Sequence, residues 1–174
     1  MTRALRTVLT LAPFLIVSWS AEPAAAAEHR IGIGAHFWKT VDDLADDGFD
    51  DIEEDGLAWV VSYQYLPRGL LNFEIDLEYY DDGFGGSTEG SWAPIGFVLL
   101  GNRIYVGAGV GVTVLDGLDD VSDPFYVGRV GYQIDLLGAL RLDINANYRA
   151  NAFSELDEAD TDAVTLGVHL RVKL

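Results

Sequence analysis

Asn72-Phe73-Glu74-Ile75-Asp76-Leu77-Glu78-Tyr79 alternates polar and apolar residues at every position. The segments 140–149 and 164–174 repeat this alternation. Successive side chains of a β-strand point to opposite sides, so a period of two indicates a strand with one apolar face. A clear helical stripe is not seen in any window beyond residue 27. The pattern therefore predicts an all-β fold.

Five further segments fit the strand period more loosely, because glycine often takes the place of the polar residue. They are 30–39, 57–66, 92–100, 103–115 and 125–136. In 92–100, Pro94 and Gly96 share a face, and either face could be the apolar one. Strands of roughly nine to thirteen residues are longer than the usual ~5–6 residues of soluble strands. They suit the ~9–11 tilted residues that cross a bilayer.

The connections between these segments alternate in length and in charge. Twenty-one of the 28 acidic residues lie in the four long connections 40–56, 81–91, 116–124 and 150–162. The short connections 67–69, 101–102 and 137–138 contain no acidic residue. Outer-membrane barrels have this layout, with short periplasmic turns and longer outer loops. Residues 28–174 are therefore predicted to form an eight-stranded antiparallel up-and-down transmembrane β-barrel with acidic extracellular loops.

The first 27 residues predict export. Arg3 and Arg6 precede an apolar run, and the segment ends in Ala24-Ala25-Ala26-Ala27, which is the pattern of a cleaved secretory signal peptide. A membrane anchor is the alternative, but the run is shorter than the ~20 residues of a spanning helix. Together with the loop pattern, the leader predicts the outer membrane of a Gram-negative bacterium as the location.

Composition narrows the function classes. The chain of 174 residues has a formal net charge of −17, yet 49% of it is hydrophobic, which excludes disorder for most of it. Such an acidic chain repels phosphates, so we expect no nucleic-acid partner. The absence of cysteine excludes a disulfide scaffold, a thiolate metal site and a cysteine nucleophile.

The polar faces of the predicted strands carry five acids and five bases, although the chain as a whole is strongly acidic. A narrow eight-stranded lumen must be filled by side chains and must balance its charges. We therefore predict an interior network of ion pairs, with the apolar faces toward lipid. A soluble barrel with a charged, solvated exterior is the alternative. The network residues are Glu74, Asp76, Glu78, Arg129, Asp135, Arg141, Asp143, Arg149, Arg171 and Lys173.

Aromatic residues cluster at the strand ends that adjoin the acidic connections. Aromatic rings with polar tips favour membrane interfaces, which predicts a girdle there. The alternative is the general preference of strands for aromatic residues. The girdle residues are Phe37, Trp38, Trp59, Tyr79, Tyr80, Trp92, Tyr126 and Tyr148.

The layout of residues 29–174 resembles the small outer-membrane barrels of the OmpA/OmpX type. The closing stretch 168–174 is similar to the terminal signal that outer-membrane assembly machinery reads, with Leu174 at the usual aromatic position. The resemblance implies fold and location rather than an activity. It implies outer-membrane lipid, lipopolysaccharide and the assembly machinery as partners, and we expect a monomer.

Candidate chemistry is sparse. His36 and His169 are expected in the lumen on neighbouring strands but at different heights, and we interpret them as polar lumen residues. Barrel lipid A deacylases have a serine two residues from the histidine on a strand, where this chain has Arg171. In the first acidic connection, Asp51, Glu53 and Asp55 precede Gly56, loosely like the start of a calcium loop. A solvated loop is the alternative there.

The sequence thus predicts a non-enzymatic outer-membrane barrel that acts in envelope integrity or surface contact through its acidic loops. Three other functions stay open: a small pore or OmpW-like channel for small or hydrophobic molecules, a lipid-modifying enzyme, and a soluble periplasmic ligand-binding barrel. No cofactor is expected, apart from Ca²⁺ or Mg²⁺ at the loops, where it could bridge to lipopolysaccharide phosphates.

Overall fold

The computed structural model describes residues 27–40, 56–81, 90–115, 121–150 and 163–174. Nearly all of these residues lie in strands. Within these ranges, there is no helix of the length and hydrophobicity needed to span a membrane.

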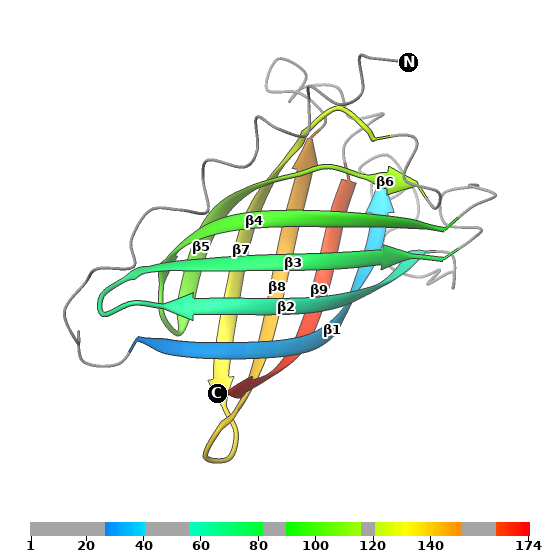
Figure 1. Ribbon diagram of the computed structural model, residues 1–174. Coiled ribbons are helices and arrows are strands. Elements are labelled where there is room, and N and C mark those ends of the chain that lie inside the picture. Colours follow the sequence, from blue (N-terminus) through cyan, green and yellow to red (C-terminus); the bar gives the residue numbers. More distant parts are fainter. Residues whose placement is uncertain (1–26, 41–55, 82–89, 116–120, 151–162) are drawn as a thin grey trace, which may run out of the picture.

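Nine strands follow one another along the chain and close into a barrel (Figure 1). All pairings are antiparallel: consecutive strands pair, except that β5 pairs with β7 and β6 pairs with β4, and β9 pairs with β1 to close the barrel. The strands are β1 (Glu28–Thr40), β2 (Leu57–Leu66), β3 (Leu71–Tyr80), β4 (Ser91–Gly101), β5 (Ile104–Gly111), β6 (Val114–Leu115), β7 (Phe125–Asp135), β8 (Leu140–Ala150) and β9 (Ala163–Lys173).

The barrel wall has eight strand positions rather than nine, because β6 continues the line of β5 along their common partner strand, β4. Both pair with β4, and only residues 112–113 interrupt them. The predicted strand 103–115 is therefore interrupted, and β5 and β6 together occupy one strand position in the barrel. With that difference, the eight-stranded antiparallel up-and-down barrel is confirmed.

The short turns lie at one end of the barrel. Gly101, the last residue of β4, leads into the turn to β5 with a φ of 117°, which favours glycine, and a Cβ there would lie 2.2 Å from the carbonyl oxygen of Ile104. Its amide donates to the carbonyl of Leu70 at 2.7 Å, which ties this turn to the neighbouring one. The turn residues thus fix the register of the adjoining strands.

Apolar side chains face outward and most polar ones inward. On β3, Ile75 is 60% exposed, while Glu74 and Asp76 beside it are 2% and 0% exposed. Ile33, Val168 and Leu170 are likewise exposed on the strands that close the barrel. A soluble barrel has the opposite arrangement. The outer surface is therefore built for contact with lipid.

One side of the interior is apolar, which differs from the polar lumen that the sequence predicted. Ile95, Phe97 and Leu99 of β4 are buried, and Pro94 and Gly96 face outward, which settles the ambiguous face of this strand. A Cβ at Gly107 or Gly109 of β5 would lie 2.4 or 2.5 Å from Leu99 or Phe97. The glycine face of β5 therefore makes room for the large side chains of β4.

Candidate functional site

A carboxylate on β3 is the centre of a buried network that crosses the lumen. Glu74 accepts hydrogen bonds at 2.7 Å from Arg129 Nη1 of β7 and from Arg171 Nη2 of β9. Gln64 Nε2 donates to its second oxygen at 3.0 Å. The Glu74, Arg129 and Arg171 side chains have no solvent exposure. These ion pairs therefore connect strands on different sides of the barrel.

Arg129 also joins the polar and apolar halves of the interior. Its Nη2 donates to Asp76 Oδ2 at 2.8 Å, and its Nε donates to Asn147 Oδ1 at 2.5 Å. Its guanidinium carbon lies 3.8 Å from the centroid of the Phe97 ring, within cation–π range. Arg129 therefore satisfies two carboxylates and an amide while packing against the apolar side.

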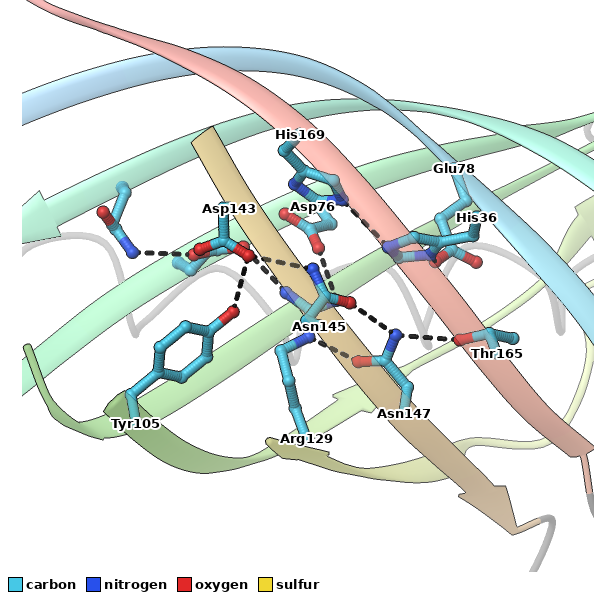
Figure 2. A network of polar contacts seen from close by, with 12 residues as sticks. His36, Asp76, Glu78, Tyr105, Arg129, Asp143, Asn145, Asn147, Thr165 and His169 are labelled. Atoms are coloured by element: carbon cyan, nitrogen blue, oxygen red, sulfur yellow. Dashed lines mark hydrogen bonds and ion pairs between the residues drawn. The ribbon is translucent and has the colours of Figure 1, made fainter. Parts of the chain in front are cut away.

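Asp143 of β8 is a second acceptor centre, nearer the turn end. Its oxygens accept from the Tyr105 hydroxyl and Gln133 Nε2, each at 2.8 Å, and from Asn145 Nδ2 at 3.0 Å. Figure 2 shows this group continuing through Asn147 to Thr165. The two centres meet at Arg171, whose Nε lies 3.7 Å from Asp143.

Two histidines form a chain of hydrogen bonds beside the ion pairs (Figure 2). His169 Nε2 lies 2.9 Å from His36 Nε2, and His36 Nδ1 lies 2.5 Å from Glu78. Arg171 Nη2 lies 3.0 Å from His169 Nδ1. Because arginine only donates, His169 Nδ1 accepts, and its Nε2 carries the proton that points to His36. His36 in turn donates from Nδ1 to Glu78, so both rings are neutral in this arrangement.

The two histidines lie at different heights, as predicted, but their rings meet, which the sequence did not predict. The register of β1 with β9 pairs His36 with Gly167 and Gly34 with His169. A Cβ at Gly167 would lie 2.5 Å from His36 Cδ2, and one at Gly34 would lie 2.4 Å from His169 Cδ2. Each ring therefore lies over the glycine of the opposite strand, which brings the two Nε2 atoms together.

The structure divides the ten predicted network residues into three groups. The central six, which are buried, are Glu74, Asp76, Glu78, Arg129, Asp143 and Arg171. Arg149 is half-buried at the acidic-loop end, with its guanidinium 3.4 Å from the Phe125 ring centroid. Arg141 is half-buried at the turn end and pairs with Asp135 at 2.6 Å.

Asp135 and Lys173 do not lie in the buried interior, which corrects their predicted place. Their side chains are 54% and 51% exposed, at the turn end of the barrel. Lys173 pairs with Glu28 at 2.9 Å, and Glu28 also pairs with the buried Arg30. The sequence argument missed this β1–β9 group, because Glu28 and Arg30 stand at the very start of the first strand.

Six of the eight predicted girdle residues lie on the outward face. Trp59 is 61% exposed, and the ring centroids of Tyr79 and Trp92 are 4.6 Å apart. Phe37, Tyr126 and Tyr148 alternate with inward-facing neighbours and also face outward. The prediction is wrong for Trp38 and Tyr80, which lie inside with ring centroids 5.6 Å apart. Two adjacent aromatic residues on one strand cannot share a face, so one of each pair is internal.

The side chains of the described strands fill the centre of the barrel. A cavity among Glu78, Phe97, Arg129 and Asn147 measures about 10 Å³, near the minimum that one water requires. Neither lumen histidine hydrogen-bonds to a serine within the described ranges. Asp51, Glu53 and Asp55, most of the acidic connections and residues 1–26 of the predicted leader lie outside the described residues.

The fold is similar to that of two solved bacterial barrels. Neisserial surface protein A matches with a TM-score of 0.54 and 13% identity, over 88% of this chain and all (100%) of that one. The chain has the fold of a small outer-membrane β-barrel. The N-terminal barrel domain of Pseudomonas aeruginosa OprF matches with a TM-score of 0.53 and 9% identity, over 86% of this chain and 100% of that one. No protein-family model and no curated protein matches the sequence.

Proposed function

We propose that this chain is a non-enzymatic integral outer-membrane protein whose side-chain-filled barrel displays acidic loops at the cell surface. One observation carries the proposal: the barrel is apolar outside and charged inside. Exposed Ile33, Ile75 and Val168 favour hydrocarbon, whereas buried ion pairs such as Arg129–Glu74 occupy the lumen. Twenty-one of the chain's 28 acidic residues lie in the four long connections of the sequence, so surface contact and envelope integrity are the roles that best use them.

Location is tested by cell fractionation combined with gel mobility. An outer-membrane barrel is recovered with the outer-membrane fraction and migrates differently before and after boiling in SDS, because the unboiled barrel stays folded. Recovery in the soluble periplasm, with one mobility under both conditions, would contradict the proposal. That result would favour the soluble ligand-binding barrel.

A pore is the second candidate, and the filled interior weighs against it. Arg129 and Arg171 reach Glu74 across the lumen, and Phe97 packs against Arg129. Planar bilayers separate the two functions. We expect no steady single-channel steps from the refolded wild type. Reproducible steps from the wild type would overturn the filled-barrel proposal and favour a channel.

An activity on lipid is also distinguishable. Arg171 contacts His169 where a serine would be needed, which supports a non-enzymatic role. Mass spectrometry of lipid A from cells with and without the protein tests this directly. Unchanged lipid A is expected, and a mass change that depends on the protein would contradict the proposal.

The proposed role of the loops rests on divalent cations that bridge their carboxylates to lipopolysaccharide phosphates. Addition of Ca²⁺ at millimolar concentration to the refolded barrel should raise its melting temperature and protect the loops from protease. A sodium salt at matched ionic strength is the control, because it screens charge without bridging. An equal response to both salts, or no response, would refute cation binding by the loops.

A further inference from the structure

The buried interior has fewer positive than negative charges. Four buried carboxylates, Glu74, Asp76, Glu78 and Asp143, face two buried guanidiniums, Arg129 and Arg171. Arg30 is buried too, but it pairs with Glu28 at the turn end. If half-buried Arg149 is included, one negative charge remains in excess. Unpaired buried charge is strongly unfavourable, so this interior favours an additional cation.

A specific place for that cation lies beside the histidine chain. His36, Asp76 and His169 each offer a ligand atom, and these atoms lie within 4.8 Å of one another. All three residues are 0% exposed. Asp76 Oδ1 accepts no hydrogen bond, although it is buried. An acceptor with no partner next to two imidazole nitrogens is what a cation ligand set requires.

We propose that His36 Nε2, His169 Nε2 and a carboxylate oxygen of Asp76 bind one divalent transition-metal ion of the Zn²⁺ class. Two imidazoles and one carboxylate are typical ligands of such ions, whereas Ca²⁺ and Mg²⁺ prefer an all-oxygen set. The three ligands lie on β1, β3 and β9. The ion would therefore cross-link the first and last strands, which pair to close the barrel.

Binding displaces the proton that lies between the two rings. The Nε2 atoms lie 2.9 Å apart. Zn–N bonds of about 2.0–2.1 Å in tetrahedral geometry require a separation of about 3.3 Å, a small adjustment of the two rings. His169 binds the ion as a neutral ring, so its proton moves from Nε2 to Nδ1, and Arg171 gives up its contact with Nδ1 while it keeps its hydrogen bond to Glu74. The ion therefore adds two positive charges, which match the two carboxylates in excess of Arg129 and Arg171.

His36 already has the hydrogen-bond partner that histidine ligands of metal ions usually have. His36 donates from Nδ1 to Glu78 at 2.5 Å. Carboxylate–histidine–metal arrangements of this kind orient the imidazole and make its other nitrogen a better ligand. Gly34 and Gly167 leave the space in which the rings lie. Glu78 is therefore a positioning residue, and the two glycines permit the approach of the ligands.

The test measures the metal content of the untagged chain, refolded into detergent micelles with Zn²⁺ and then separated from free metal. Elemental analysis should find one more Zn²⁺ per wild-type chain than per H36Q or H169Q chain. D135N removes an exposed carboxylate that is not part of the buried interior and should keep the ion. Zinc bound by the acidic loops would remain in every variant, so only the difference counts. Equal zinc in wild type and histidine variants would overturn the proposal.

A spectroscopic measurement on the wild type decides the matter if a variant fails to fold. Refolding with Co²⁺ should give the intense visible absorption of a four-coordinate site with nitrogen ligands, and added Zn²⁺ should abolish it. Folding is checked independently by gel mobility without boiling. A folded wild-type barrel that shows only the weak spectrum of hydrated Co²⁺ would overturn the proposal.

Discussion

Removal of the Arg129 guanidinium tests whether buried ion pairs hold the barrel interior together. Arg129 donates to Glu74 at 2.7 Å and to Asp76 at 2.8 Å, and all three side chains are fully buried. In R129M, Glu74 retains Arg171, but Asp76 loses its guanidinium partner. Loss of one partner of a buried pair destabilises a protein by about 3–5 kcal/mol. The cation–π contact with Phe97 is desolvated and adds about 2 kcal/mol.

The matched control is R141M, which removes the same type of side chain from a pair at the turn end in which the carboxylate of Asp135 is exposed. That carboxylate is 54% exposed, so the expected loss is at most about 1 kcal/mol. Urea unfolding in detergent micelles containing EDTA, followed by tryptophan fluorescence, gives both free energies. R129M should unfold at a much lower urea midpoint than R141M.

The double variant R129M/D76N separates unpaired charge from lost packing. Because D76N removes the carboxylate that R129M leaves without a partner, the double variant should be more stable than R129M alone. Coupling between contacting residues in such cycles is about 0.5–3 kcal/mol. Equal midpoints for R129M and R141M, or no recovery in the double variant, would refute the claim that these buried pairs stabilise the barrel.

Two further substitutions test the interior and the exterior. G167A places a Cβ 2.5 Å from His36 Cδ2 and should lower the unfolding free energy by about 1–3 kcal/mol, whereas G128A, with nothing within 4 Å of its Cβ, should have little effect. Equal urea midpoints for the two glycine variants would contradict the close ring packing. I75R, near the middle of the lipid-facing belt, should lower stability in lipid vesicles by about 2–4 kcal/mol, and I104R, beside a tight turn, by about 0–1 kcal/mol. If the two arginine variants were equally stable, Ile75 would not lie deeper in the bilayer than Ile104.

Strict alternation made most of the barrel predictable. On β3, polar and apolar residues alternate from Leu71 to Tyr79, so a shift of one residue would turn every charge to the lipid. The strand β4 has apolar residues on both faces, and the local sequence therefore does not distinguish them. The choice depends on β5, whose inward glycines Gly107 and Gly109 accept Leu99 and Phe97. That is a contact between strands rather than a property of either one.

The histidine pair was not predictable from the sequence for a related reason. No turn joins β1 to β9, so no short connection fixes the register of this pair. In the β4–β5 hairpin, by contrast, the turn after Gly101 fixes the register. The apposition of His36 and His169 follows from closure of the whole barrel. A signal was nevertheless present, since each histidine stands two residues from a glycine, Gly34 or Gly167, that could accept a ring from the neighbouring strand.

The most direct measurement of the inside-out barrel is fluorescence quenching by lipids brominated near the headgroup end of the acyl chains. Trp59 faces outward and is 61% exposed, whereas Trp38 packs against the interior cluster. Variants that retain only one of these tryptophans are refolded into brominated and ordinary vesicles. We predict strong quenching of Trp59 and weak quenching of Trp38. Equal quenching of the two, or a chain that stays in the aqueous phase, would contradict a lipid-facing exterior around a filled interior.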